Sequence, residues 1–379
     1  MSAHDVLVLH LVASDISAEA RDALRLILEH PDPGIAQRVI PVGKGGGRPH
    51  ATPHAITPNA PPLLHWILGL ALRRKLERCT SLTPRRPAVI HAWSPGAAQA
   101  FLPLAATHRP MVLNAEPGMR PHLLAAWSRS GTLGFVCQSR AVQRQLFRAG
   151  VPEARCVLIR PAVADSAPIG PDRRADVRRQ LKLDERHIVI AALPLASCPT
   201  ATFTATWAAL LLEKVRPEVR LMIPASSPGA ERARRLAVSC RHERVIRSLP
   251  PTMPWRDSLG ASDLAVYLPS GDAPIASLAN ALASGCPVVA SSVPTVTELL
   301  VDGETAWLCA PDDPKDAARR MLQAIENVQQ SRRQADQARA LARRTFFTPL
   351  MLAAYRRLYL NLATRRPAAS AQLHALLST

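Results

Sequence analysis

The sequence predicts an α/β protein made of two doubly wound parallel-sheet domains with a cleft between them. Three observations support this fold class. The 379 residues exceed what one ordinary hydrophobic core can hold. Short apolar runs alternate with helical patterns, which is typical of strand–helix–strand units in a parallel sheet. A polar stretch punctuated by prolines, at 164–185, interrupts the alternation and indicates a domain boundary.

The first half supplies the elements of one such domain. Apolar runs predict strands at 5–13, 37–43, 88–94, 110–116 and 133–139. Amphipathic patterns predict helices at 18–30, 63–79, 96–107 and 140–150. Ser139 stands before the last of these helices as its N-cap, and Gly150 ends it. The Gly- and Pro-rich segment 44–62 predicts a mobile loop.

A fresh alternation follows the boundary and predicts the second domain. Its strands are expected at 187–193, 219–224, 243–248, 263–269, 287–291 and 306–309. Its helices are expected at 201–216, 229–239, 254–261, 274–284, 294–301 and 313–327. The last helices, at about 331–365, are rich in Arg, Leu and Tyr. We therefore predict an N-terminal domain at 1–165, a C-terminal domain at 166–345 and terminal helices at 346–379 that cross back to the N-terminal domain.

The chain is strongly basic, with a formal net charge of +18 and an isoelectric point near 10.9. Such a charge suits a nucleic acid, an anionic membrane or a diphosphate substrate, whereas Arg scattered along a whole chain also reflects a GC-rich genome. No block of five or six like charges marks a binding tail. With 3 Tyr and 6 Phe, the chain offers few aromatic rings for base stacking, so the prediction is no nucleic-acid partner.

The cysteines and the apolar runs bear on the compartment. None of the seven Cys is spaced as C-x2-C, so they predict free thiols in a reducing compartment and no metal site. The N-terminus has no basic region typical of a signal peptide, and no run of 18 apolar residues occurs, so the predicted location is cytoplasmic. The helix at 63–75 has two interpretations. It lies on an anionic membrane surface, at the inner face, with Trp66 as an anchor, or it covers a parallel sheet.

Motifs for the common nucleotide cofactors are absent. No G-x-G-x-x-G follows the first strand, where the sequence reads "ASDISAEA". The "GKGGG" at 43–47 lacks the spacing of a Walker motif and follows the second strand. These observations argue against an NAD enzyme and a P-loop ATPase, and we predict no cofactor.

Polar and aromatic residues end two neighbouring strands of the first domain. His91 and Trp93 lie in "HAWSPG", and Asn114 and Glu116 lie in "LNAEPG". Ligands of open α/β sheets bind at the carboxyl ends of strands, so these four residues are predicted on the acceptor side of a site. The alternative is a packed strand end with His91 hydrogen-bonded in the core, and for Trp93 the sequence favours this alternative. Because burying an unpaired carboxylate is costly, we expect Glu116 either to face the cleft or to pair with an Arg.

The stretch 255–310 and its surroundings carry a family resemblance. The stretch resembles the C-terminal half of family-four retaining glycosyltransferases of the GT-B fold, whose two domains are Rossmann-like. The resemblance covers roughly residues 130–365 well and the first 130 loosely. The segments that carry it are "ASDLAVYLPS", "LANALASGCPVVASSVPTVTELLVDGETAWL", "DDPKDAARRMLQAIEN", "VCQSRAVQRQLFRAGVPEARCVLIRPAV" and "ARALARRTFFTPLMLAAYRRLYLNL".

The resemblance implies transfer of a sugar from a nucleotide diphosphate-sugar to a glycan or lipid-linked acceptor. The N-terminus of the helix at 274–284 would meet a phosphate, since it offers unpaired N–H groups and a positive dipole end. The reaction would be retaining, of the hexosyltransferase type and independent of a metal, with no assigned protein nucleophile. The resemblance implies that Asp272 contacts the donor sugar as the catalytic position and that Asn280 contacts the ribose. It implies that Glu298 lies nearby and that four residues contact the phosphates, namely Gly271, Pro274, Ile275 and Ala276.

Three departures from the family pattern leave the activity open. The family's two spaced glutamates fall on Asp272 and Asn280, so the second position carries no charge. The family's Arg and Lys that grip the diphosphate have no counterpart in "AALPLASCPTATF" at 191–203. The Gly-rich acceptor loop of the family is replaced by "ASDISAEA". Two hypotheses remain, an active glycosyltransferase and a catalytically silent GT-B scaffold that binds a nucleotide or a partner protein. A basic peripheral-membrane or nucleic-acid binder is a third, weaker one.

Overall fold

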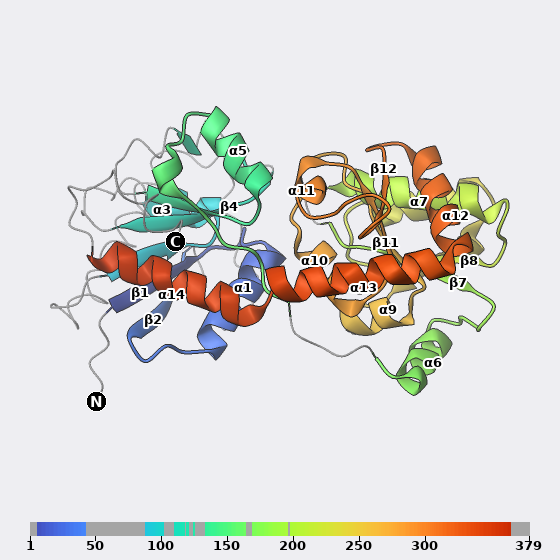
Figure 1. Cartoon of the computed structure of the whole chain (residues 1–379), viewed down its shortest axis with the longest axis horizontal. Coiled ribbons are helices and arrows are strands. Elements are labelled where there is room, and N and C mark those ends of the chain that lie inside the picture. The colour runs from blue at the N-terminus through green and yellow to red at the C-terminus, as the bar shows by residue number, and fades with distance from the viewer. Residues whose placement is uncertain are drawn as a thin grey trace. The chain divides into compact units, whose positions relative to one another are not determined.

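The chain folds into two compact units (Figure 1). The computed structural model describes residues 6–42, 88–101, 110–117, 119–120, 124–125, 133–163, 169–195 and 198–364. Unit 1 comprises Met1–Arg160 together with Pro349–Thr379, and unit 2 comprises Pro161–Thr348. The loop predicted at 44–62 and the helix predicted at 63–79 lie outside the described residues.

Unit 1 contains a six-stranded parallel sheet in the order β2-β1-β3-β4-β5-β6. The strands are β1 (Val6–Val12), β2 (Ile35–Pro41), β3 (Ala88–Ala92), β4 (Met111–Ala115), β5 (Leu133–Cys137) and β6 (Cys156–Leu158). The helices are α1 (Ala18–Glu29), α3 (Pro95–Phe101), α5 (Arg140–Arg148) and α14 (Thr348–Thr364). Ser139 caps α5 as predicted, because its Oγ accepts a hydrogen bond from Val142 N at 3.1 Å. Gly150 follows α5 with φ of 90°, a conformation that favours glycine.

Unit 2 contains a second six-stranded parallel sheet, in the order β12-β11-β10-β7-β8-β9. Its strands are β7 (Ile188–Ala192), β8 (Val219–Pro224), β9 (Ile246–Leu249), β10 (Leu264–Tyr267), β11 (Val288–Ser291) and β12 (Trp307–Cys309). Its helices are α6 (Pro171–Gln180), α7 (Pro199–Glu213), α8 (Ala230–Ser239), α9 (Trp255–Ala261), α10 (Ala276–Ser284), α11 (Pro294–Thr297), α12 (Pro314–Glu326) and α13 (Val328–Thr345). The predicted class, α/β with two doubly wound parallel sheets, is confirmed.

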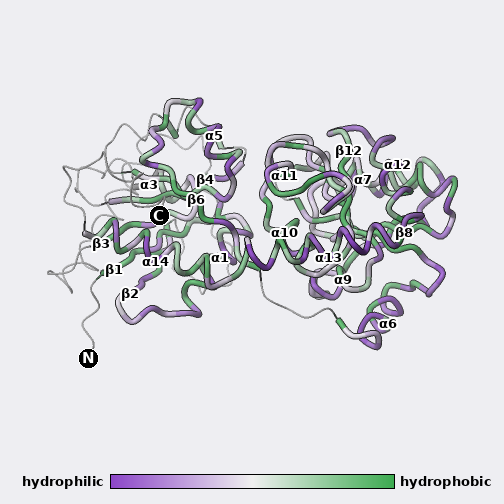
Figure 2. The backbone as a smooth tube through the Cα atoms, viewed as in Figure 1, coloured by the Kyte–Doolittle hydropathy of each residue, from purple (hydrophilic) through white to green (hydrophobic). Residues whose placement is uncertain are grey.

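Both faces of the second sheet are buried, which explains its continuous apolar strands. On one face Tyr267 packs in a core with residues of α10 and α13. On the other face Val266, the neighbour of Tyr267 in β10, packs with residues of α7 and α12. Alternate side chains of one strand therefore serve two cores. Figure 2 shows α10 as a hydrophobic segment and α6 as a largely hydrophilic one.

The hydrophilic helix α6 is held to unit 2 by arginines in addition to one fully buried apolar residue, Val177. Arg174 donates to the carbonyl oxygens of Gly260 and Ser262 at 2.6 and 3.0 Å, and its other terminal nitrogen lies 2.6 Å from Asp263 Oδ1. Arg173 pairs with Asp257, which lies one turn of α9 before Gly260.

No described helix is long and apolar enough to cross a membrane.

Candidate functional site

The loop between β10 and α10 lies at the carboxyl edge of the second sheet, where ligands of open α/β sheets bind. Hydrogen bonds fix its conformation at both ends. Asp272 Oδ1 accepts from Thr295 N at 3.0 Å, which ties the loop to the start of α11. The hydroxyl of Tyr267 donates to the carbonyl oxygen of Pro274 at 2.8 Å. The predicted donor loop is therefore a defined backbone path that holds a carboxylate at the sheet edge.

The helix that follows this loop begins without a side-chain cap. Ile275 occupies the N-cap position of α10, and none of the described side chains accepts from the first turn. The same holds for α8, whereas Asp313 caps α12 through Lys315 N and Asp316 N. In the first turn of α11, Thr295 N donates to Asp272 Oδ1, and the Cys198 thiol accepts from the backbone of Ala201 in the first turn of α7. Each of these helices follows the carboxyl end of a strand. The edge therefore gathers positive helix ends whose N–H groups are available to an anion.

Neutral groups occupy the place where the family pattern has its cationic clamp. Cys198 precedes α7, and its Sγ lies 3.2 Å from Thr200 Oγ1 and 3.5 Å from Ser270 Oγ. Burial raises the pKa of the Cys198 thiol, but hydrogen bonds with Thr200, Ser270 and the Ala201 backbone outweigh burial, so the pKa is lowered overall. The sequence indicates the missing Arg and Lys but does not reveal this cluster of hydroxyls and thiol.

The predicted donor residues differ in exposure. Gly271 and Asn280 are exposed, and Asn280 Nδ2 donates to the Ala276 carbonyl oxygen within its own helix at 2.9 Å. Pro274 and Ile275 are buried and precede the helix, which begins two residues later than predicted. The N–H groups of the first helical turn therefore start at Ala276. A Cβ at Gly271 would have no neighbouring atom within 4 Å, so the fold itself does not require glycine there.

The fourth implied donor residue, Glu298, lies at the end of α11. It is half-buried and forms the C-cap of this short helix. The helix starts at Pro294, next to the Thr295 that holds Asp272. One turn of α11 therefore connects the backbone contact of Asp272 with Glu298.

Glu116 lies at the carboxyl edge of the first sheet, after β4. Its carboxylate accepts a hydrogen bond from the Ser17 hydroxyl. Burial raises the pKa of Glu116 to about 7, with smaller contributions from Glu19 and Asp15. The Ser17 contact partly opposes the rise. Glu116 therefore changes charge near neutral pH.

A second carboxylate on the same edge escaped the sequence analysis. Asp15, after β1, accepts from Ser94 Oγ at 2.5 Å and from Gly96 N at 2.7 Å. These contacts place it at the start of α3, where a carboxylate is stabilised by the helix dipole. Its position after the first strand, in "ASDIS", is the signal that could have identified it.

The other three acceptor-side candidates are buried in unit 1. His91, Trp93 and Asn114 are each at most 2% exposed. His91 Nδ1 lies 2.7 Å from the Tyr359 hydroxyl, and His91 Nε2 lies 3.2 Å from Asn114 Oδ1. Trp93 stacks on His91 with ring centroids 4.0 Å apart. The structure favours the packing interpretation for these side chains, since their contacts are with the core and with α14.

The hydrogen bonds of the buried histidines define their tautomers. Trp93 Nε1 donates to His10 Nδ1 at 3.0 Å, so His10 Nε2 carries the proton and donates to Gln37 Oε1. Because Asn114 Oδ1 only accepts, His91 is protonated at Nε2, and its Nδ1 accepts from Tyr359. Burial lowers the pKa of His10 to about 4 and lowers that of His91 well below its usual value. Both rings are therefore neutral at pH 7.

The comparisons with known proteins agree with this architecture. Residues 206–341 match the family model described as glycosyl transferases group 1. A glycosyltransferase from Rickettsia africae matches 96% of this chain and 100% of its own, with 13% identity and a TM-score of 0.75. HepE from Anabaena, in complex with UDP and glucose, matches 94% of this chain and 99% of its own, with 16% identity and a TM-score of 0.76. The chain has the GT-B fold. No curated protein matches it.

A third solved structure shares the GT-B fold, and the comparisons confirm the GT-B part of the resemblance found in the sequence, whereas the retaining family-four type stays a prediction. WaaG, a glycosyltransferase involved in lipopolysaccharide biosynthesis, matches 92% of this chain and 98% of its own, with 13% identity and a TM-score of 0.65. The family match lies within unit 2, which contains the loop with Asp272. The match supports sugar transfer as the general activity of this GT-B chain.

The buried hydrogen bonds of His91 in unit 1 lead to a prediction about the stability of this GT-B chain. Tyr359→Phe removes the only hydrogen bond that the described residues give to His91 Nδ1, and a buried acceptor left unpaired costs roughly 1–3 kcal/mol. We expect urea unfolding to show this loss. Tyr355→Phe is the matched control, because its hydroxyl makes a longer contact, 3.5 Å, with Asn114 Oδ1. Equal losses in the two variants would contradict the assigned hydrogen bond.

Proposed function

We propose that the chain transfers a sugar from a nucleotide diphosphate-sugar to a glycan or lipid-linked acceptor. The observation that carries this proposal is the uncapped N-terminus of α10, which begins directly behind the fixed carboxylate of Asp272. A diphosphate needs donors of hydrogen bonds and positive charge, and the helix end supplies both. The carboxylate, which only accepts hydrogen bonds when ionised, suits sugar hydroxyls. HepE, a solved structure of similar fold, is described in complex with UDP-glucose.

The proposed roles follow the position of each residue along the loop and helix. Asp272 contacts the donor sugar, and the backbone from Gly271 to Ala276 contacts the phosphates. Asn280 contacts the ribose once its side chain leaves the Ala276 carbonyl oxygen. Glu298 lies near Asp272 through α11. On the other unit, Glu116 contacts the acceptor.

The proposed reaction is retaining and uses helix N–H groups in place of a metal. A preorganised set of N–H donors stabilises the charge that develops on the departing diphosphate. We place the reaction in the cytoplasm, at the inner face of the membrane when the acceptor is lipid-linked. The free thiols of the described cysteines suit a reducing compartment.

A catalytically silent scaffold that binds a nucleotide is the second candidate function. The neutral cluster of Cys198, Thr200 and Ser270 favours it, since a fixed cation on a leaving diphosphate contributes several kcal/mol to catalysis. Two measurements separate the candidates. Calorimetry with UDP, GDP and ADP tests the shared nucleotide site, and no binding at millimolar concentration would exclude both. Binding without hydrolysis of any sugar donor in a panel would select the scaffold.

A substitution at the ribose position tests the assignment of Asn280. Asn280→Glu introduces a charged acceptor for ribose hydroxyls, and a hydrogen bond to a charged group contributes more than one between neutral groups. We expect calorimetry to show an increase in nucleotide affinity of roughly threefold to tenfold. Asn280→Leu, which removes both polar groups, should lower the affinity. Unchanged affinity in both variants would place Asn280 away from the ribose.

A further inference from the structure

A polar pocket in unit 2 lies at a different edge of the sheet from the donor loop. It has a volume of about 740 Å³ and lies between the end of α12, the start of α13 and the loop that contains Gly303 and Glu304. That loop leads into the amino end of β12, whereas α10 begins after the carboxyl end of β10. Because all strands of the sheet run parallel, the pocket and the donor loop are at opposite edges.

Buried hydrogen bonds hold the walls of this pocket in place. Gln334 is 3% exposed, and its Nε2 donates to the Gly303 carbonyl oxygen at 3.0 Å, which ties the loop to α13. Trp307 Nε1 donates to Ser331 Oγ at 3.0 Å, and Ser331 in turn donates to the Ala324 carbonyl oxygen at 2.8 Å. These bonds connect the loop, β12 and both helices, so the pocket is preformed.

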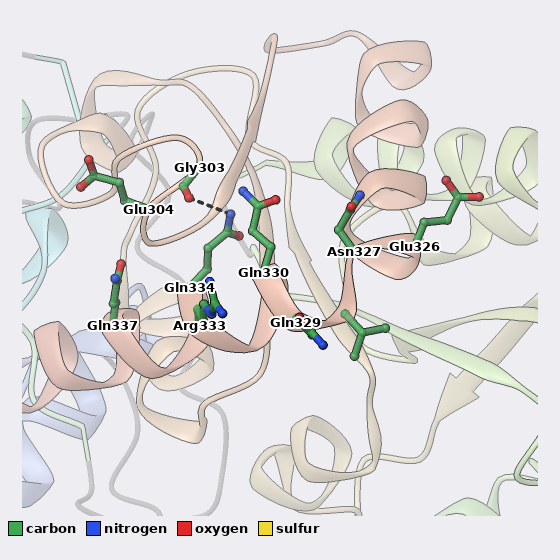
Figure 3. Close-up of a pocket in the computed structure, with 10 residues that line it drawn as sticks. Gly303, Glu304, Glu326, Asn327, Gln329, Gln330, Arg333, Gln334 and Gln337 are labelled. Carbon is green, nitrogen blue, oxygen red and sulfur yellow. Dashed lines mark hydrogen bonds between the residues drawn. The ribbon is translucent and has the colours of Figure 1, made fainter.

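Amide side chains dominate the lining. The five amide residues are Asn327, Gln329, Gln330, Gln334 and Gln337, which include four of the chain's twelve Gln. Figure 3 shows the amides of Gln330 and Gln334 on the side of α13 that faces the loop with Gly303, and Asn327 beside the end of α12. Each amide both donates and accepts hydrogen bonds, as a sugar hydroxyl does. The lining therefore matches a ligand rich in hydroxyl groups.

The charges of the lining do not form a cationic site. Glu304, Glu326 and Arg333 are exposed, and Glu326 lies 3.7 Å from Arg216, so the lining has no excess of positive charge even though the chain has a net charge of +18. In Figure 3 the two carboxylates lie at opposite ends of the row of amides. A phosphate, a nucleic acid or an anionic lipid would find no cluster of positive charge here. A neutral ligand does not need one.

The first turn of α13 adds donors at the same place. Asn327 is the N-cap residue, but its side chain donates to the Gln323 carbonyl oxygen at 2.8 Å and does not cap the helix. The N–H groups of Val328 and Gln329, both in the pocket lining, are left for an acceptor on a ligand. The backbone N–H groups and the side-chain amides together can donate to and accept from the hydroxyl groups around a sugar ring.

We propose that this pocket binds a neutral oligosaccharide at a site separate from the donor loop. The volume falls within the range of ligand pockets and accommodates two or three sugar rings. Such a site would hold a part of a glycan acceptor remote from the reacting end. The binding itself does not depend on the proposed sugar transfer.

Saturation-transfer NMR on the full chain tests this proposal with three neutral probes, maltotriose, cellotriose and chitotriose. We expect at least one probe to bind with a Kd of about 1 mM, since polar contacts alone carry the affinity. Gln330→Ala and Gln337→Ala, both at exposed positions of α13, should each weaken it about tenfold. Gln180→Ala, at an exposed position of α6, is the matched control and should leave the affinity unchanged.

Two further measurements keep this site distinct from the donor site. Saturating UDP should not displace the bound trisaccharide. A hyaluronan tetrasaccharide, which is anionic, should not bind in the pocket, so any signal that it gives should be the same in the wild type and in Gln330→Ala. Three outcomes would each overturn the proposal. They are no binding of any neutral probe, displacement of the trisaccharide by UDP, and equal affinities in the pocket variants and the control. Loss of sugar transfer with intact trisaccharide binding would refute the proposed function only.

Discussion

Ala276→Asp is expected to stabilise unit 2 and to abolish nucleotide binding. A carboxylate in the first turn of α10 interacts favourably with the helix dipole and supplies a missing acceptor, which contributes about 0.3–1 kcal/mol to stability. The same carboxylate would lie within a few ångströms of the phosphates of a bound nucleotide. Repulsion between charges at that separation lowers affinity by roughly 100-fold or more. Thermal unfolding and calorimetry with UDP, GDP and ADP measure the two effects.

Ala276→Asp is informative because it should raise the stability of unit 2 and lower the affinity for a nucleotide. Most damaging substitutions lower stability and binding together, whereas this one separates them. Ala276→Asn is the matched control, since its side chain has nearly the same shape and no charge. We expect the control to retain nucleotide affinity within a few-fold of the wild type. If Ala276→Asp binds a nucleotide as tightly as the control does, the phosphates lie elsewhere.

Glu116→Gln is expected to stabilise unit 1 at alkaline pH. Burial raises the pKa of this carboxyl from 4.5 to about 7, so its contribution to stability is present below the unfolded pKa and is lost as pH rises through 7. The pKa difference corresponds to roughly 3 kcal/mol above pH 8. An uncharged amide avoids this cost, and its oxygen still accepts from Ser17. The variant and the wild type should therefore have equal stability near pH 4, should diverge as pH rises from 4.5 to about 7, and should keep a constant difference above that.

Urea unfolding of both proteins between pH 4 and pH 8 measures this difference. His10 and His91, with lowered pKa values, make the fold less stable as pH falls below 6.5, but they titrate in both proteins and cancel in the comparison. A difference that is the same at every pH would contradict the raised pKa. If Glu116 contacts the acceptor, the same variant should lose transfer while nucleotide binding is kept.

The fold class could be predicted because the strands are buried on both faces. Runs such as 219–224 stand out as apolar segments between turn residues, and the predicted strand there coincides with β8. Helix ends were predicted less well, since distant contacts set them. The helix after β10 begins at Ala276, two residues later than predicted, because Tyr267 holds the Pro274 carbonyl oxygen in the loop.

The site could be predicted only as far as local patterns reach. The family resemblance indicated the loop with Asp272, and the rule that ligands lie at carboxyl ends of strands indicated Glu116; both stay predictions. The burial of His91 was one of two expectations, but its hydrogen-bond partner could not be predicted, because Tyr359 is 268 positions away in the sequence. Likewise, Thr200 lies in the first turn of α7 and Ser270 in the loop after β10, so the two residues that contact Cys198 share no motif.

The return of α14 to unit 1 sets an order for folding during synthesis. Unit 2 is one continuous segment, Pro161–Thr348, and all of it emerges from the ribosome before α14 does. Unit 1 needs Tyr359 to complete the hydrogen bonds of His91, so this buried network stays incomplete until α14 has been made. Although domains usually complete their folding from the N-terminus onward, we expect the second unit of this chain to finish first.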